Sequence, residues 1–217
     1  MTHKERMYAA LRHEEADKVP KGEVMVHDLL IEKLLGRDVP GAEDNALLRW
    51  MTEALSDVQF AAHRDVRELL AMDWVHSFPL EPFRDMGSDE NGHPLIRDVW
   101  GTVIRRTPES FDALGLVIPD IEAADEYEFP SVDDFSFANL RRWVHESDLF
   151  TVCQLDTGFF KIHQLVGFEN YMVATRVHRE KLHGLMERFM QLEIALARKA
   201  VEEGVDAIWL SDDFAHN

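Results

Sequence analysis

Short apolar segments alternate with amphipathic segments along this chain, and this alternation limits the fold more than any other feature. The clearest amphipathic segment is 181–203, where apolar residues recur with the period of a helix and Gly204 follows. Strands that alternate with helices predict a parallel sheet. We therefore predict an α/β fold of the (β/α)8 TIM-barrel type, incomplete, with about four core parallel strands. The strand candidates are residues 22–26, 72–78, 150–155 and 205–210.

Two further patterns add elements to this barrel. Thr2 and Glu5 have the spacing of a capping box, which predicts an N-terminal helical cap. Asn91-Gly92 is typical of a two-residue hairpin turn and predicts a β-hairpin insertion between residues 83–85 and 95–105. The sequence contains no internal repeat and no flexible linker, so we expect a single domain over residues 1–217.

The charge and cysteine content argue against several classes of function. A formal net charge of −18 disfavours nucleic acid and anionic membrane surfaces as partners. The single cysteine, Cys153, can form neither an intramolecular disulfide nor a cysteine-based zinc cluster alone. The sequence shows no signal-peptide pattern and no apolar stretch of the ~20 residues that cross a bilayer. We therefore expect a cytoplasmic protein without membrane association.

Polar residues follow the strand candidates, at the sheet edge where barrels and open α/β sheets place their active sites. The candidate catalytic residues are Asp212, Asp213, Asp156 and His27, and the candidate substrate-binding residues are His76, Lys161, His163 and Asp28. Several of them converge if the four strands are parallel neighbours. Such a cluster can hold a metal ion or perform acid–base catalysis, and sequence spacing alone leaves both open. Helix caps and turns are the alternative role for the individual residues.

Four motifs carry a resemblance to a known superfamily. They are the segments Arg6–Pro20, Asp98–Thr102, Gly167–Met172 and Ala197–Asp213, which read R-x-x-A-A-L-x-x-E-x-x-D-x-V-P, D-x-W-G, G-x-E-N and A-x-x-A-x-x-x-G-x-D-x-I-x-x-x-D-D. In order and spacing the chain resembles the uroporphyrinogen decarboxylases and cobalamin-dependent methyltransferases. The resemblance implies a (β/α)8 barrel whose double aspartate faces the barrel mouth. It covers the front part of such a barrel, so we expect this chain to be the N-terminal portion of a longer enzyme, inactive by itself.

The decarboxylase branch of that superfamily fits the chain poorly. The segment Val24–Leu29 lacks the arginine motif that the resemblance implies for substrate carboxylates. Leu80 stands where a decarboxylase has an aspartate, and Val166 stands where it has a tyrosine. We therefore favour corrinoid-linked methyl transfer. Uroporphyrinogen decarboxylation and a non-catalytic remnant that serves as a binding or assembly module are the alternatives.

The resemblance also implies cofactors and partners. The methyltransferase branch holds zinc through a His-x-Cys pair and a later cysteine, all downstream of the double aspartate. We therefore expect no cofactor or metal bound by this chain alone, and a corrinoid protein and zinc for the full-length family member. The expected partners are a small-molecule substrate and a corrinoid protein. A second copy of the chain is a further expected partner, because the outer strands near Val24 and Ile208 would otherwise present unpaired apolar edges.

Overall fold

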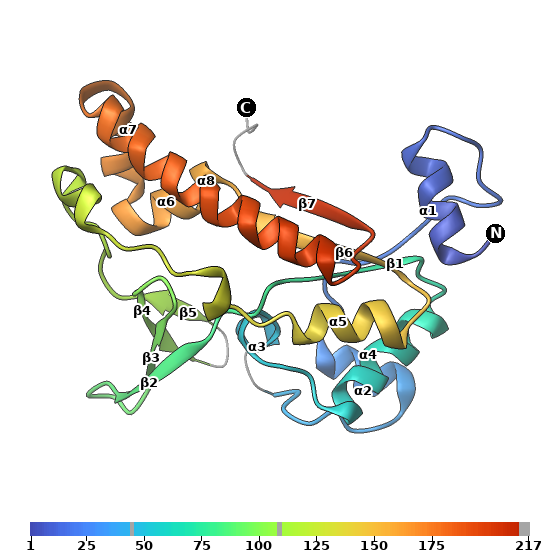
Figure 1. Ribbon diagram of the computed structural model, residues 1–217. Coiled ribbons are helices and arrows are strands. Elements are labelled where there is room, and N and C mark those ends of the chain that lie inside the picture. Colours follow the sequence, from blue (N-terminus) through green and yellow to red (C-terminus); the bar gives the residue numbers. More distant parts are fainter. Residues whose placement is uncertain (44–45, 108–109, 213–217) are drawn as a thin grey trace. The chain divides into compact units, whose positions relative to one another are not determined.

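The computed structural model describes residues 1–43, 46–107 and 110–212, without the side chains of residues 46 and 47. The chain forms two compact units (Figure 1). Unit 1 contains Met1–Leu80, Ser136–Gln154 and Ala200–Ile208, and unit 2 contains Glu81–Phe135, Leu155–Lys199 and the residues after Ile208. Each unit therefore assembles segments that are far apart in the sequence.

Unit 1 is rich in helices whose starts are fixed by side-chain caps. The capping box predicted at Thr2 and Glu5 is confirmed, since Thr2 Oγ1 accepts the Glu5 N–H at 3.2 Å and Glu5 Oε2 accepts the Thr2 N–H at 2.8 Å. Ser56 and Gln59 form a second capping box in front of α4. The helices of unit 1 are α1 (His3–Leu11), α2 (Asp28–Leu35), α3 (Ala46–Thr52), α4 (Asp57–Leu69) and α5 (Ala138–Glu146).

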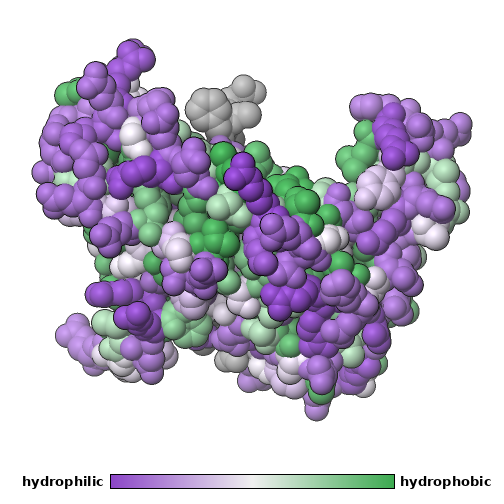
Figure 2. Space-filling model, viewed as in Figure 1, coloured by the Kyte–Doolittle hydropathy of each residue, from purple (hydrophilic) through white to green (hydrophobic). Residues whose placement is uncertain are grey.

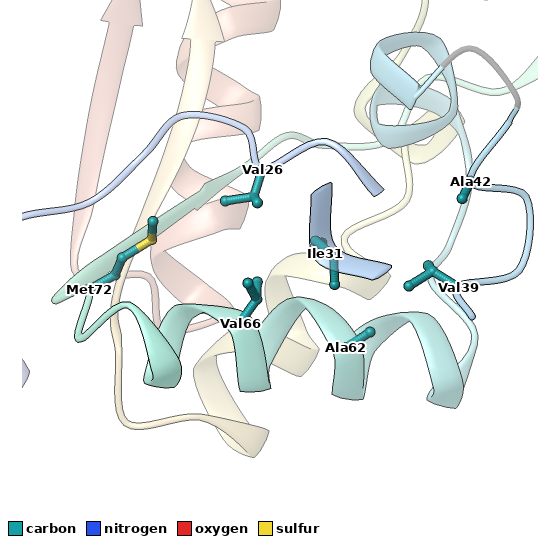
Figure 3. Packing of buried hydrophobic residues seen from close by; sticks show 7 residues of the cluster. All are labelled: Val26, Ile31, Val39, Ala42, Ala62, Val66 and Met72. Atoms are coloured by element: carbon teal, nitrogen blue, oxygen red, sulfur yellow. The ribbon is translucent and has the colours of Figure 1, made fainter. Parts of the chain in front are cut away.

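The apolar faces of α2 and α4 pack against each other in a core cluster of unit 1 (Figure 3). Ile31 on α2 and the side chains of Ala62 and Val66 on α4 are completely buried and point toward one another. The other members of the cluster are Val26, Val39, Ala42 and Met72. The buried residues are spaced at helical intervals, so each helix presents one apolar face to the core. Burial of that face stabilises short helices that would be only marginally stable alone.

A small parallel sheet carries the strand ends on which the predicted site depends. It contains β1 (Trp74–Ser77), β6 (Phe150–Asp156) and β7 (Ala207–Ser211) in the order β1-β6-β7. β1 pairs with β6 in parallel, with His76 opposite Val152. The prediction of strands at 72–78, 150–155 and 205–210 is therefore confirmed.

The expected first strand at residues 22–26 is wrong, and the sheet has three strands rather than four. Only Gly22 forms a bridge, to Trp74. Carboxylate side chains accept hydrogen bonds from backbone N–H groups in and next to this segment. Asp73 accepts the Lys21 N–H at 3.0 Å, and Glu23 accepts the Val24 N–H at 3.0 Å. Because these amides are already satisfied, the segment does not continue a ladder with β1.

Unit 2 contains a separate antiparallel sheet of β2 (Phe83–Ser88), β3 (Pro94–Asp98), β4 (Val103–Arg106) and β5 (Phe111–Ala113) in sequential order. The hairpin predicted around Asn91-Gly92 is confirmed, with Gly92 at a φ of 82°. Its connection is longer than the predicted two residues, since the Asp89 N–H donates to the His93 carbonyl at 2.9 Å. The expected single strand at 95–105 is instead two strands. A tight turn separates them, in which the Asp98 carboxylate accepts the Thr102 N–H at 2.7 Å and Gly101 adopts a φ of 92°.

The helices of unit 2 follow β6. They are α6 (Gly158–Val166), α7 (Phe168–Val177) and α8 (Arg179–Glu202), which extends slightly beyond the predicted 181–203 segment at its start. Two 3-10 helices, η1 (Ile121–Glu126) and η2 (Val132–Asp134), lie in the connection before α5. At Gly167, between α6 and α7, an added Cβ would meet the Leu116 side chain at 2.9 Å, so the backbone there passes close to its neighbour.

The architecture is mixed α/β, and no barrel closes within the described residues. β7 forms one edge of the parallel sheet, and its Trp209 and Leu210 are exposed. Figure 2 shows apolar residues interrupting an otherwise polar face. None of the helices in the described part of the chain has both the length and the apolar character that crossing a membrane requires.

The contact between Gly22 and Trp74 gives a test of unit 1. A Cβ at Gly22 would overlap the Trp74 indole ring, so we expect Gly22→Ala to destabilise the protein by about 1–3 kcal/mol through overpacking. Gly184→Ala is the control, because an added Cβ there meets nothing within 4 Å and alanine favours the helix by roughly 0.5–1 kcal/mol. Urea unfolding of both variants measures the difference, and equal stability would contradict the close packing at Gly22.

Candidate functional site

Four acidic residues of unit 2 lie around one lysine side chain. Lys161 comes from α6 and Asp156 from the carboxyl end of β6, directly before that helix. Glu81 immediately precedes β2 in this unit, Asp98 ends β3, and Glu193 lies on α8. We refer to Glu81, Asp98, Asp156, Lys161 and Glu193 as the Lys161 cluster.

The Lys161 ammonium is buried and held by carboxylates. Its Nζ lies 3.1 Å from Asp156 Oδ2, 3.6 Å from Glu81 Oε1 and 4.6 Å from the centroid of the Trp100 ring. Burial disfavours the charged form, but the charges of Glu81 and Asp156 outweigh it and raise the pKa of Lys161. The residue is therefore a fixed cation at neutral pH and does not act as a nucleophile.

Two carboxyl groups of the cluster titrate near neutral pH. Burial raises the pKa of Asp98 to about 6. Burial also raises the pKa of Glu193 to about 8, and the nearby charge of Asp156 adds to the effect. A carboxyl with a pKa near the working pH can both accept and donate protons efficiently, so the cluster is suited to general acid–base chemistry.

Aromatic side chains of unit 2 fix the cluster in place. The Tyr127 hydroxyl donates to the Trp100 backbone carbonyl at 2.9 Å, and the Trp100 ring lies 5.9 Å from the ring of Phe189. Phe189 is on α8, one helical turn before Glu193. The rings therefore set the positions of both the lysine and the glutamate.

Of the predicted residues in unit 1, Asp28 and His76 are buried and His27 is exposed. His27 caps α2 through its Nδ1, which accepts the Leu29 N–H at 3.3 Å. Asp28 forms an ion pair with Arg49, and His63 Nε2 lies 2.8 Å from Asp28 Oδ1. Burial lowers the pKa of His63 to about 3, and the charges of Arg67 and Arg49 add to this, so His63 is neutral.

Part of this network lines a small cavity of unit 1. Its polar lining is the Asp28, Arg49 and His63 group, and its apolar lining is Met25, Val26, Trp50 and Leu55. Asp28 was predicted as a substrate-binding residue, and its carboxylate is already neutralised by Arg49. The group is therefore a compact, internally paired ion cluster beside the cavity.

His76 belongs to the aromatic interior of unit 1. It is completely buried in β1, with its ring 4.7 Å from Trp50 and 5.0 Å from Phe78. Burial lowers the pKa of His76 to about 4, and the charge of Arg67 contributes. The imidazole is therefore neutral at pH 7 and packs as part of the core.

The remaining predicted residues lie in or beyond unit 2. His163 on α6 has its Nδ1 2.9 Å from the Phe159 carbonyl oxygen and packs against the Phe168 ring. Asp212 accepts a hydrogen bond from the Thr157 hydroxyl, next to Asp156 in the sequence. Asp213 lies outside the described residues.

Of the eight predicted residues, Asp156 and Lys161 belong to the Lys161 cluster, whereas His27, Asp28 and His76 belong to unit 1. Sequence reasoning missed Glu81, Asp98 and Glu193 as site residues. One signal was available: Glu193 follows Leu192 on the apolar face of α8, where an acidic residue is unexpected. Asp98 also carries a signal, because it begins the D-x-W-G motif, whereas Glu81 carries none.

Neither the scan of family models nor the search of curated proteins finds a match. Among solved structures the chain is similar to a methyltransferase from Methanosarcina mazei, with a TM-score of 0.59 and 18% sequence identity. The alignment covers 96% of this chain and 58% of that chain. The chain therefore shares a methyltransferase-like fold and spans just under three-fifths of its structural neighbour's length.

The central lysine can be tested through stability. Lys161→Met removes the only cation of the cluster and leaves buried carboxylates uncompensated, so we expect a loss of about 2–4 kcal/mol in the free energy of unfolding at pH 7.5. Lys181→Met is the control, because its ion pair with Asp125 is screened by solvent and should contribute little to stability. Equal urea midpoints for the two variants would show that Lys161 is not held by the carboxylates.

The raised pKa of Glu193 predicts a distinct dependence of the free energy of unfolding on pH. Its pKa rises from 4.5 to about 8 on folding, so its contribution to stability is complete below pH 4.5 and is lost as pH rises to about 8. We expect Glu193→Gln to be more stable than the wild-type protein at pH 8, by on the order of 1 kcal/mol, and to lose this advantage toward pH 5. Glu187→Gln, at an exposed position on α8, should follow the wild-type profile in urea unfolding.

Proposed function

We propose that the protein is a methyltransferase that acts with a corrinoid partner on a small-molecule substrate. The observation that carries this proposal is the shared fold with a methyltransferase over 96% of the chain. The four sequence motifs that resemble the cobalamin-dependent methyltransferases support the same conclusion. Because the structural neighbour is longer, the proposed activity belongs to the whole protein of which this chain can be a part.

The Lys161 cluster supplies the proton chemistry that such a reaction needs. When a methyl group passes to an acceptor X–H, the new X–CH3 bond forms, the bond to the methyl donor breaks, and X–H loses its proton. The Asp98 carboxylate, with its pKa raised to about 6, is the group we assign to take that proton. Lys161 stabilises the neighbouring negative charge and holds Asp156 and Glu81 in place.

The zinc that the family resemblance implies does not fit the described residues. No group of three or more histidine, cysteine, aspartate or glutamate side chains in 1–43, 46–107 and 110–212 is arranged to hold a metal ion. Cys153 is completely buried in β6 and contributes no exposed thiolate. We therefore assign no step of the reaction to a metal held by these residues.

The test is anaerobic methyl transfer from methylcobalamin to a panel of small thiols, followed by the absorbance of methylcobalamin. We expect protein-dependent loss of methylcobalamin and formation of the methyl thioether. Asp98→Asn should lower the rate by about 100-fold or more, which is the lower end of general-base contributions. Asp133→Asn, at an exposed position in η2, should leave the rate unchanged.

Two outcomes would contradict the proposal. One is the absence of transfer to every acceptor by the full-length protein. The other is turnover of uroporphyrinogen, which would favour the decarboxylase alternative. Because Asp98→Asn preserves the shape of the side chain, a matching circular dichroism spectrum separates a lost base from a lost fold.

A further inference from the structure

The Lys161 cluster has more negative than positive charge. Its four carboxyl groups surround a single ammonium group. Another cation of α8, Arg188, donates to the carbonyl oxygens of Tyr127 and Ala124. In a buried setting an excess of carboxylates is relieved either by protonation or by a bound cation.

One carboxylate oxygen of the cluster lacks a hydrogen-bond partner. The Glu193 side chain accepts from the Asp156 backbone N–H, but its Oε2 is buried and meets no donor among the described residues. The residue is only 4% exposed, so bulk water does not satisfy this atom. Buried polar atoms are almost always paired, and an exception indicates a missing ligand or proton.

The surroundings of Glu193 are suited to an organic cation. The Trp100 ring already has the Lys161 ammonium 4.6 Å from its centroid, and Phe189 lies next to Trp100. Aromatic faces attract ammonium groups, and the attraction increases where water is excluded. The side chains of Glu81 and Asp156 remain 17% and 20% exposed, so the cluster reaches solvent at these two residues.

We propose that the Lys161 cluster binds a small primary ammonium ion, whose N–H group donates to Glu193 Oε2 and whose charge is balanced by the carboxylates around it. An ammonium fits better than a metal ion, because the described carboxylates form no metal-holding group and Glu193 lacks a hydrogen-bond donor. This binding does not depend on the proposed methyl transfer, since it is an equilibrium property of unit 2.

Binding of the ammonium ion is coupled to release of a proton from Glu193. The ammonium needs the carboxylate form of Glu193, which faces Asp156 at the end of β6, Lys161 on α6 and Glu81 before β2. Asp98 on β3 interacts with Lys161 and Glu81 of the same cluster. Since Glu193 holds a proton below pH of about 8, binding there expels it. Affinity should therefore rise by up to about tenfold per pH unit below pH 8 and level off above it.

Isothermal titration calorimetry of the whole protein with methylammonium chloride tests the proposal at pH 6.5, 7.5 and 8.5, at constant ionic strength. We expect one saturable site, affinity that increases with pH, and release of about one proton at pH 6.5, obtained from two buffers of different ionisation enthalpy. Tetramethylammonium lacks an N–H donor and should bind at least tenfold more weakly. Titration heats, unlike a turnover assay, report on binding even if methyl transfer is absent.

Matched variants decide the result. Glu193→Gln should weaken methylammonium binding at least tenfold and abolish proton release, whereas Glu187→Gln on the same helix should behave as the wild-type protein. Asp98→Asn is the second variant and should weaken binding without abolishing the proton release of Glu193. The absence of saturable binding, or equal binding by wild-type protein and Glu193→Gln, would overturn the proposal.

Discussion

The buried ammonium of Lys161 is the constraint on which the chemistry of unit 2 depends. An isolated charge in such a place is costly, and it is tolerated only when opposite charges approach closely. Asp156 and Glu81 meet that demand at 3.1 and 3.6 Å. The carboxyl groups outnumber the lysine. Burial, together with the negative charge of Asp156, raises the pKa of Glu193 to about 8 and keeps it protonated at neutral pH. The same imbalance provides a proton acceptor and a place for an external cation.

Unit 1 pairs its buried carboxylates Asp73 and Asp28 with cations of the same unit. The Asp73 carboxylate is completely buried and is held by Arg6 and by His3, whose Nδ1 lies 2.9 Å away. Asp28 is similarly paired with Arg49. Burial keeps His63 and His76 neutral, with pKa values of about 3 and 4. These groups stabilise the packing of unit 1. In unit 2 the carboxyl groups of the Lys161 cluster outnumber its one ammonium, which leaves Glu193 available to a ligand.

The position of the Lys161 cluster in the fold bears on its function. The carboxyl end of a parallel strand is the usual position for reactive side chains, and Asp156 occupies that position on β6. The antiparallel sheet of unit 2 and the long helix α8 bring Asp98 and Glu193 to the same lysine. A chain similar in fold to a methyltransferase thus has an acid–base cluster at a strand end, which is the combination that the proposed function uses.

The sequence by itself determined the local elements: the capped first helix, the Asn91-Gly92 turn, α8 and three strands, since caps, turns and periodicity act over a few neighbouring residues. It also identified Asp156 and Lys161, which share one strand-to-helix junction. Residues 22–26 could not be predicted correctly, because the Asp73 carboxylate and the Trp74 ring decide where that backbone goes. Only the tertiary structure placed Glu81, Asp98 and Glu193 near Lys161. The interaction between charges depends on their distance in space and not on their separation along the chain, so the sequence could not reveal these partners.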